Sequence, residues 1–382
     1  MEHHKYPMTC NRTYSHIAVA ESGNVATPCC QFSNYRKTQV VELAKIDSFN
    51  QVLESPQWAD IRDKIETGQA NAHCSNCFSL EDQGLESLRT HYNSRSPLNG
   101  TLALQDIEIA LDFTCNMMCR ICKPAQSSKW AQANGLVGQL NQFDPMHYSM
   151  PNAGKPYSNN IKRLIQNSNF SKLKRIRLVG GEPLYSRLFV EFLERVDADV
   201  GLENIDLSMN TNGSIIPEAD KAKLLRKCKS LQIQLSIDAI GELANVIRPG
   251  IPWQQIQENV PQWVSFVGAE NTIQIHATFS IMNVNQMQSL VDFATSNGAV
   301  FSGHKLFNPA YLRMDQIPRS ASWRISNEYS WYDQFNGMLE TPLVESQLDR
   351  FVQAMLLMDS HHGKSFAQVN PEIWQLVHEQ LR

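Results

Sequence analysis

The chain has 382 residues, of which 42% are hydrophobic and 19% are charged, and its formal net charge is −4. This balance is that of a globular protein and excludes a disordered one, and the charge gives no reason to expect nucleic acid or an anionic membrane as a partner. Because one hydrophobic core rarely exceeds roughly 250–300 residues, we expect one large domain and a smaller one.

The opening stretch "MEHHKYPMTC" has no apolar run, and no later segment reaches the ~20 apolar residues of a membrane helix. We therefore expect no signal peptide and no membrane span, and a cytoplasmic location. In that reducing compartment most of the nine cysteines should be free thiols or ligands.

Residues 1–100 contain five cysteines. They are Cys10, Cys29, Cys30, Cys74 and Cys77. The text "IAVAESGNVATPCCQF" predicts a hairpin that ends at a cysteine, "PQWADIRDKIETG" predicts a helix, and a Cys-x2-Cys pair follows. Four thiolates in such an arrangement can hold zinc or an iron–sulfur cluster, and the residues alone leave both open.

Residues 101–310 alternate between short apolar strands and amphipathic helices. The predicted strands are 107–113, 175–179, 204–210, 231–237, 272–281 and 299–307. Near-continuous apolar strands that alternate with helices indicate a parallel sheet covered by helices. We expect an α/β fold, a partial (β/α)6 barrel with its chemistry at the carboxyl ends of the strands. Residues 311–382 should form a helical extension.

The stretch "LDFTCNMMCRICKP" ends the first of these strands and carries Cys115, Cys119 and Cys122. A four-iron cluster closed by protein needs four ligands, so three thiolates leave one iron without a protein ligand. That iron can take a small molecule. Half of a zinc site is the alternative that this spacing alone leaves open.

The spacing resembles that of the radical S-adenosylmethionine (radical SAM) superfamily, in which an apolar residue precedes the last cysteine, here Ile121. The resemblance implies that SAM chelates the open iron, that an electron from the cluster cleaves the sulfonium, and that the resulting 5′-deoxyadenosyl radical takes a hydrogen atom from the substrate. The three cysteines are then the catalytic group.

Further motifs follow in the order of that family. They are Gly180, Gly181, Glu182 and Pro183 in "LVGGEPLY", Asn210 and Asn212 in "SMNTNGS", Ser236 and Asp238 in "LSIDAIGE", and Arg248 in "VIRPG". By similarity, the first motif binds the SAM ammonium, the polar side chains contact its ribose and methionyl groups, and the arginine binds its carboxylate. Asn210, Asn212 and Ser236 could instead form turns or cap helices.

Residues 1–100 resemble the twitch domain, a short form of the SPASM domain that holds an auxiliary four-iron cluster. The resemblance implies Cys10, Cys29, Cys74 and Cys77 as ligands, with Cys30 as a substitute for Cys29. Such domains commonly follow the barrel, whereas this one precedes it. A cluster with four thiolates would conduct electrons, either from the substrate radical or toward the first cluster.

The expected function is oxidative modification of a peptide or protein side chain, with dehydrogenation of a sugar or aminocyclitol as the alternative and a non-catalytic zinc-binding protein as the remote one. The expected cofactors are two 4Fe-4S clusters and SAM, and the expected partner is an electron donor such as flavodoxin or ferredoxin. His276, His304, Lys305 and Tyr311 are further candidates for a substrate pocket.

Overall fold

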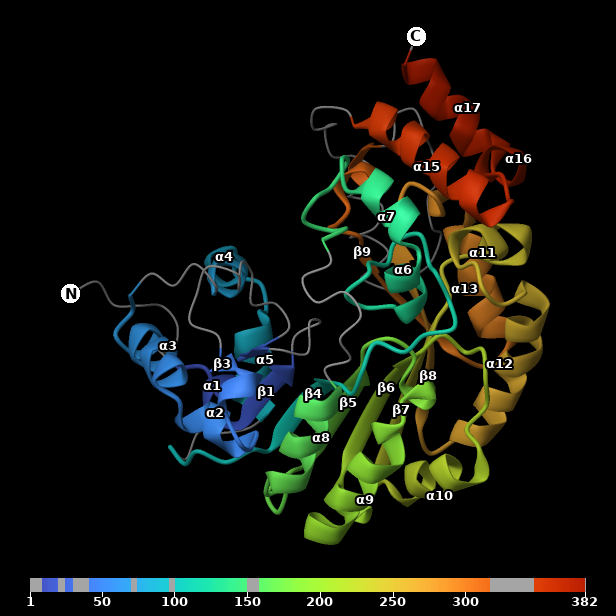
Figure 1. The fold of residues 1–382 in the computed structure, drawn as a ribbon. Helices are drawn as coiled ribbons and strands as arrows, with labels where there is room; N and C mark the ends of the chain where they lie inside the picture. The colour runs from blue at the N-terminus through green and yellow to red at the C-terminus, as the bar shows by residue number, and fades with distance from the viewer. Residues whose placement is uncertain are drawn as a thin grey trace. The chain divides into compact units, whose positions relative to one another are not determined.

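The computed structural model describes residues 9–19, 25–29, 41–69, 74–95, 100–149, 158–316 and 347–381. The chain forms two compact units (Figure 1). The first comprises Met1–Asp112, Lys155–Ser208 and Glu218–Leu231, and the second comprises Phe113–Gly154, Met209–Pro217 and Gln232–Arg382. None of the helices in the described ranges is both long and apolar enough to cross a bilayer.

The first unit is built on strands from the beginning and the middle of the chain. These are β1 (His16–Val19), β2 (Val25–Thr27), β3 (Val41–Glu42), β4 (Asp106–Ala110) and β5 (Arg175–Val179). β1 pairs with β2 and β2 with β3 in antiparallel fashion, whereas β1 pairs with β4 and β4 with β5 in parallel. The predicted hairpin is therefore present, and a parallel sheet begins beside it.

Helices surround these strands. They are α1 (Arg12–Ser15), α2 (Asn50–Glu54), α3 (Pro56–Glu66), α4 (Ser75–Asp82), α5 (Leu88–Arg95), α8 (Ser158–Asn167), α9 (Leu188–Val200) and α10 (Ala219–Lys227), with short 3-10 turns at Leu43–Lys45, Pro183–Tyr185 and Leu202–Asn204. α3 lies where the sequence predicts it. Ser55 caps it by accepting from the backbone of Trp58, and Pro56 occupies its first turn, where no amide donor is needed.

β6 (Asp206–Thr211) and β7 (Ser230–Ser236) begin in the first unit and end in the second. The remaining elements of the second unit are α6 (Ser128–Gln132), α7 (Asn134–Leu140), α11 (Gly241–Ile247), α12 (Trp253–Val267), β8 (Thr272–Phe279), α13 (Met287–Ser296), β9 (Val300–Lys305), α15 (Leu348–His362), α16 (Phe366–Val369) and α17 (Pro371–Gln380), with 3-10 turns at Val284–Gln286, Ala310–Leu312 and Met314–Gln316.

β7, β8 and β9 are parallel and in register, with Leu235 opposite Ile275 and Ile275 opposite Phe301. These three side chains are buried, and α12 and α13 lie along β8 in Figure 1, as their packing contacts require. The α/β class with a mostly parallel sheet is therefore confirmed. All six predicted strands of the parallel region are present.

The first of those strands ends earlier than the alternation of apolar residues suggests. The predicted strand runs to residue 113, but β4 ends at Ala110. Asp112 leaves the ladder because its carbonyl accepts from Gly181 at 3.4 Å and its carboxylate accepts from the hydroxyl of Ser186 at 2.6 Å. A polar turn thus replaces the end of the strand.

Candidate functional site

The three predicted cysteines lie in a loop between β4 and α6. Cys119 is buried, Cys115 and Cys122 are half-buried, and all three are free thiols. The backbone of Cys115 is fastened twice to the hydroxyl of Ser128, which accepts from its amide at 3.1 Å and donates to its carbonyl at 3.2 Å. Ser127 caps α6 and donates to the carbonyl of Met117 at 2.9 Å.

Two further side chains hold the carbonyl groups of the other cysteines. The indole of Trp130 donates to the Cys119 carbonyl at 2.9 Å, and the His147 ring lies 3.1 Å from the Cys122 carbonyl. Burial lowers the pKa of His147 to about 4, so the ring is neutral at neutral pH and donates through this nitrogen. Every cysteine of the loop is therefore positioned through its own main chain.

The loop also packs against the end of α11 and the segment that follows it. The amide of Met118 donates to the Pro249 carbonyl, and the amide of Arg120 donates to the Ile247 carbonyl, both at 2.8 Å. Gly250 has φ +132°, and a Cβ atom there would lie 2.6 Å from the Asn116 carbonyl oxygen. Only glycine permits this approach, so its presence follows from the loop it supports.

Arg120 ties the loop to the C-terminal helices. Its buried guanidinium donates to the Val246 carbonyl at 2.8 Å and to the carboxylate of Asp359 on α15 at 2.7 Å. Burial lowers the pKa of Arg120, and Asp359 opposes that shift. No local pattern in the sequence predicts this pair, because its members are 239 residues apart.

Arg248 lies beside the cysteine loop and forms an ion pair with Asp238. Its Nε atom is 2.7 Å from Asp238, and one of its Nη atoms is 3.6 Å from the sulfur of Cys119. Burial alone would lower the pKa of Arg248, but Asp238 and Cys119 raise it above the ordinary value. Asp238 is held in turn by the amide of Thr278 at 2.7 Å. Both residues were predicted, and they lie together.

A pocket in the second unit brings Asn212, Ser236 and Arg248 together. Met117 of the cysteine loop and Trp253 of α12 also line it, with apolar walls from Ile237, Ala239, Ala244, Ile251 and Ile256. These apolar residues were not predicted. Ile237 and Ala239 follow β7, Ala244 lies in α11, Ile251 follows α11 and Ile256 lies in α12. Their side chains carry no polar group that marks them in the sequence.

Asn212 is linked directly to the cysteine loop. Its amide donates to the side chain of Asn116 at 2.8 Å, and Asn116 donates to Ser214, also at 2.8 Å. Asn116 was missed by sequence reasoning, although it stands between two of the cysteines. The Oδ1 atom of Asn210 is buried and has no hydrogen-bond partner among the described residues. Asn210 does not line this pocket.

The thiols of Cys119 and Cys122 fit a group that carries positive charge. Burial raises the pKa of Cys119 to about 12 and also raises that of Cys122, and neighbouring cysteines add to both shifts. Such thiols become thiolates only when a cation offsets the cost of burial. The iron ions of an iron–sulfur cluster would supply that positive charge. Ile121 is half-buried beside Cys122 in the sequence.

The Gly-Gly-Glu-Pro motif belongs to the first unit, where it forms the turn after β5. Gly180 has φ +113°, and a Cβ atom there would lie 2.8 Å from the Asp112 carbonyl oxygen and 2.9 Å from Ala110. The carboxylate of buried Glu182 accepts from the amide of Leu184 at 3.3 Å, and Pro183 begins a 3-10 turn. The motif therefore forms a turn directly after β5.

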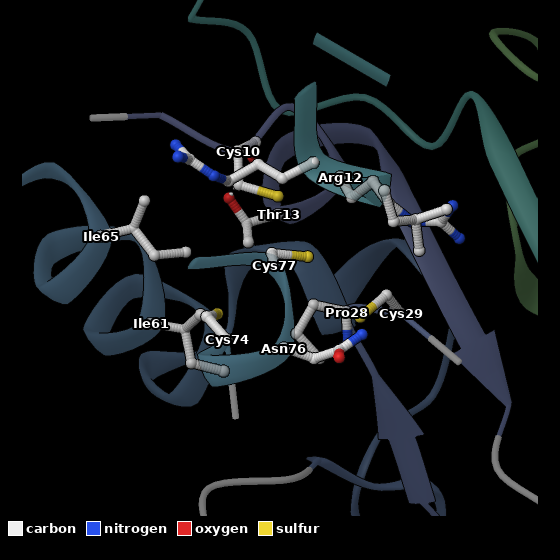
Figure 2. A pocket seen from close by; sticks show the side chains of 12 residues that line it. Cys10, Arg12, Thr13, Pro28, Cys29, Ile61, Ile65, Cys74, Asn76 and Cys77 are labelled. Carbon is white, nitrogen blue, oxygen red and sulfur yellow. Dashed lines mark hydrogen bonds between the residues drawn. The ribbon is translucent and has the colours of Figure 1, made fainter. Parts of the chain in front are cut away.

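The four other predicted ligands line one cavity of the first unit. Figure 2 shows Cys10 before α1, Cys29 after β2, and Cys74 and Cys77 at the start of α4 around a common space. The base of the cavity is Ile61 and Ile65 of α3, against which Cys10, Cys29 and Cys74 pack. Cys30 lies outside the described residues. The structure thus brings together segments that are up to 67 residues apart, from Cys10 to Cys77.

These four thiols also fit a multinuclear group. Burial raises the pKa of Cys10, and it raises the pKa of Cys74 to about 12, with further increases from the neighbouring cysteines. Among the described residues, no three His, Cys, Asp or Glu side chains meet as ligands of a single metal ion. Four thiolates are also the number of protein ligands that a 4Fe-4S cluster requires.

Of the candidates for a substrate pocket, His276 and His304 are in contact. His276 Nε2 lies 2.8 Å from His304 Nδ1, and the rings are stacked. Tyr311 is buried, and its hydroxyl is 2.7 Å from that of Tyr148. Lys305 lies 3.9 Å from Asp315.

Comparison with known proteins gives one family match, for residues 113–276, to the model of the radical SAM superfamily. Two GTP 3′,8-cyclases are among the similar curated proteins. That of Pelotomaculum thermopropionicum is 24% identical over 156 residues, which are 40% of this chain and 41% of that protein. That of Campylobacter fetus subsp. fetus is 24% identical over 199 residues, which are 50% and 52%. The match thus spans about half the length of these relatives.

Among solved structures, SuiB of Streptococcus suis bound to S-adenosylmethionine is similar at 14% identity. The superposition covers 81% of this chain and 57% of that chain, with a TM-score of 0.36. This likeness is distant.

Proposed function

From the premise that this chain carries a radical SAM superfamily domain at residues 113–276, we propose that it is a radical SAM enzyme that cleaves S-adenosylmethionine reductively and removes a hydrogen atom from its substrate. The observation that carries the proposal is the pocket in which Asn212, Ser236 and Arg248 meet the loop of three cysteines. The predicted cysteines and polar residues come from distant parts of the sequence, and the second unit gathers them.

The residues have separate roles in this proposal. Cys115, Cys119 and Cys122 hold a 4Fe-4S cluster that, when bound, supplies the electron for cleavage. Arg248 lies against Cys119 and is oriented by Asp238, so it serves both the cluster and the carboxylate of SAM. Asn212 and Ser236 bind the polar parts of SAM, and the apolar wall beside Trp253 takes its adenine.

The motif Gly180, Gly181, Glu182 and Pro183 is assigned to the SAM ammonium on the basis of the family resemblance. The same proposal treats β4–β9 as a partial (β/α)6 barrel over residues 101–310, with residues 311–382 as a helical extension. A cytoplasmic location and a flavodoxin or ferredoxin as electron donor also remain predictions from the sequence.

Residues 1–100 are proposed to form a twitch-like module whose Cys10, Cys29, Cys74 and Cys77 bind a second 4Fe-4S cluster. The shared cavity in Figure 2 supports this set. With four thiolates the cluster has no iron open to substrate, so its role is to carry electrons. An electron carrier in the same chain as a radical enzyme suits an oxidation, in which the substrate radical gives up one further electron.

We keep a peptide or protein side chain as the first substrate class. The second candidate is a small molecule, and the sequence similarity to GTP 3′,8-cyclases favours it. GTP is therefore the first small-molecule probe to use. A rise in 5′-deoxyadenosine formation on addition of GTP would favour the second class.

The test of the proposal is the release of 5′-deoxyadenosine. Protein reconstituted with iron and sulfide without oxygen is mixed with SAM and dithionite, and the product is measured by mass spectrometry. We expect product from the wild type and a loss of at least about 100-fold when Cys115, Cys119 and Cys122 are replaced by Ala. Cys228→Ala is the matched control, since Cys228 is also a half-buried free thiol but lies after α10.

Equal product from the wild type and the triple variant would contradict the proposal. Bound zinc in place of iron, with no SAM binding by calorimetry, would instead identify the zinc-binding alternative.

A further inference from the structure

The four cysteines of the cavity in Figure 2 come from three separate segments of the chain. Cys74 precedes α4 and Cys77 lies in its first turn, whereas Cys10 and Cys29 come from the region before α2. A cluster bound by four thiolates needs all of them at one place. Contacts between these segments must therefore bring Cys10 to α4.

The main chain on both sides of Cys10 is bound by α5. The Thr9 carbonyl accepts from the Nη1 atom of Arg89 at 3.0 Å and from the side-chain amide of Asn93 at 2.9 Å. The amide of Asn11 donates to the Oδ1 atom of Asn93 at 2.9 Å. Arg89 and Asn93 are one turn apart, so a single face of α5 fastens the residue before Cys10 and the residue after it.

Glu81 joins α5 to α4. It lies in α4 one turn after Cys77 and is fully buried. Its carboxylate accepts from the Nε atom of Arg89 at 3.1 Å and from a second nitrogen of the same guanidinium. A planar guanidinium can bind a carboxylate with two nitrogens and a carbonyl with the third. The helix that begins at Cys74 is therefore joined through Arg89 to the segment that supplies Cys10.

Cys29 is held by different residues. Its carbonyl accepts from the hydroxyl of Thr27 at 3.1 Å, and the Pro28 carbonyl lies 2.9 Å from the Nδ1 atom of His16. These contacts come from β1 and β2 rather than from α5. A change in α5 should therefore loosen Cys10 and leave Cys29 in place.

We propose that Glu81, Arg89 and Asn93 are positioning residues of the auxiliary site, which hold Cys10 at the cavity before iron is bound. This inference rests on the proposed second cluster. The side chains of the ion pair are 3% and 0% exposed, so water does not compete for their bonds. Protein contacts, and not the metal, then set the place of the ligand that is most distant in the sequence.

Peptide-resolved alkylation of the apoprotein measures how firmly each cysteine is held. The full-length chain is treated with iodoacetamide in the absence of metal, and the rate at each cysteine is followed by mass spectrometry. Asn93→Leu removes the bonds to Thr9 and Asn11. We expect alkylation of Cys10 to become at least about tenfold faster, since each lost hydrogen bond shifts an opening equilibrium by about two- to tenfold. Cys228, a half-buried free thiol of the same unit, should keep its rate.

Two further variants separate position from charge and from stability. Arg89→Lys keeps a positive charge beside Glu81, but a single ammonium cannot replace the guanidinium that also reaches the main chain, so Cys10 should again react faster. Phe192→Leu is the matched control, because Phe192 is fully buried in α9 of the same unit and does not line the cavity. It should not raise the rate at Cys10 relative to that at Cys228.

Reconstituted protein tests the link to the cluster. A full-length chain in which Cys115, Cys119 and Cys122 are Ala keeps the auxiliary site as its cluster site. We expect a chelator to remove iron from this chain at least about fivefold faster when Asn93→Leu is added. Phe192→Leu in the same background should leave the rate of iron loss unchanged.

The outcomes separate this inference from the proposed function. If the starting chain binds no iron, the second cluster is wrong and the inference falls with it. If it binds iron, and neither Asn93→Leu nor Arg89→Lys changes the rate at Cys10, the inference alone fails. Equal acceleration at Cys10 and Cys228 would show a general loss of stability and would also overturn it. Faster alkylation at Cys10 alone, together with faster loss of iron, supports it.

Discussion

At the scale of single residues, the pair formed by Arg248 and Asp238 explains how the second unit can keep a charge beside a buried sulfur. Asp238 is 1% exposed and accepts from the backbone of Thr278 as well as from Arg248. Its carbonyl also accepts from the side chain of Asn283 at 2.8 Å. A charge buried this deeply is tolerated only because every one of these partners is present.

Asp238→Asn should therefore destabilise the fold by about 3 kcal/mol, because it leaves the buried guanidinium of Arg248 without a counter-charge. Urea unfolding measures the loss. Lys64→Gln is the control, since the Lys64–Asp60 pair is about one-third exposed on each side and should cost less than about 0.5 kcal/mol. Equal losses of unfolding free energy in the two variants would contradict the conclusion that Asp238 neutralises the buried charge of Arg248.

Gly250 provides a second test at this scale. Gly250→Ala should displace the cysteine loop, because the new Cβ atom would lie 2.6 Å from the Asn116 carbonyl and 2.9 Å from the Met117 Cα. We expect the iron bound at this loop to fall by at least about half, as measured per chain after reconstitution. Gly268→Ala is the control, since Gly268 also has a positive φ, +73°, but has open space around it. Its iron content should be unchanged.

At the scale of elements, α15 is a support for the cysteine loop rather than a separate tail. Arg120 lies in that loop, and its guanidinium contacts the Asp359 carboxylate and the sulfur of Met355, both on α15. The side chain of Arg120 is fully buried and that of Asp359 is 12% exposed. Residues near the end of the chain therefore act on the geometry of a loop near residue 120.

A double-mutant cycle tests this connection. Arg120→Met should cost about 3 kcal/mol of stability, and its effect should be coupled to that of Asp359→Asn by about 1–3 kcal/mol. The control cycle combines Arg120→Met with Glu258→Gln on the exposed face of α12, where the two effects should add. A coupling energy near zero between Arg120 and Asp359 would contradict the inference that α15 supports the cysteine loop.

His362, in the last turn of α15, gives a pH dependence. Burial and the nearby Arg120 lower its pKa to about 4, whereas an unfolded histidine titrates near 6.5. The unfolded state therefore binds more protons between these values, and stability falls as the pH drops from about 6.5 to about 4, by at most about 3 kcal/mol. His362→Gln should flatten this part of the curve in urea unfolding, whereas His361→Gln, on the exposed neighbour, should not.

The elements of the parallel region could be predicted because each strand is a short apolar run between polar turns. The end of β4 could not, since Leu111 continues the apolar pattern and is buried, yet Asp112 already bonds to Ser186. That bond joins residues 74 positions apart, and no local pattern contains it. The supporting role of Arg120 was missed for the same reason.

At the scale of the whole molecule, each set of cysteines lies within one compact unit. Cys115, Cys119 and Cys122 belong to the second unit, and the four lining the cavity of Figure 2 belong to the first. The spacing predicted the first set as cluster ligands, and the resemblance to the twitch domain implied the second. The pocket beside the loop of three cysteines could be predicted only in part. Asn212 and Arg248 are polar and belong to recognisable motifs, whereas Ile251 and Ile256 resemble ordinary core residues.

Iron content should therefore be additive over the two sets. We expect roughly eight irons per reconstituted chain, about four after Cys115, Cys119 and Cys122 become Ala, about four after Cys74 and Cys77 become Ala, and none when both sets are removed. Metal analysis with protein quantification measures this. A Cys74 and Cys77 variant that retains all its iron would disprove the second cluster.

The dense hydrogen bonding around the three-cysteine loop has a practical consequence. Ser128, Trp130 and His147 hold the loop's main chain through contacts that involve no metal. A zinc finger, by contrast, acquires its shape only when its ion arrives. The main chain of this loop is held by hydrogen bonds that need no metal. Apoprotein purified in air should therefore bind iron and sulfide on reconstitution without first being unfolded and refolded.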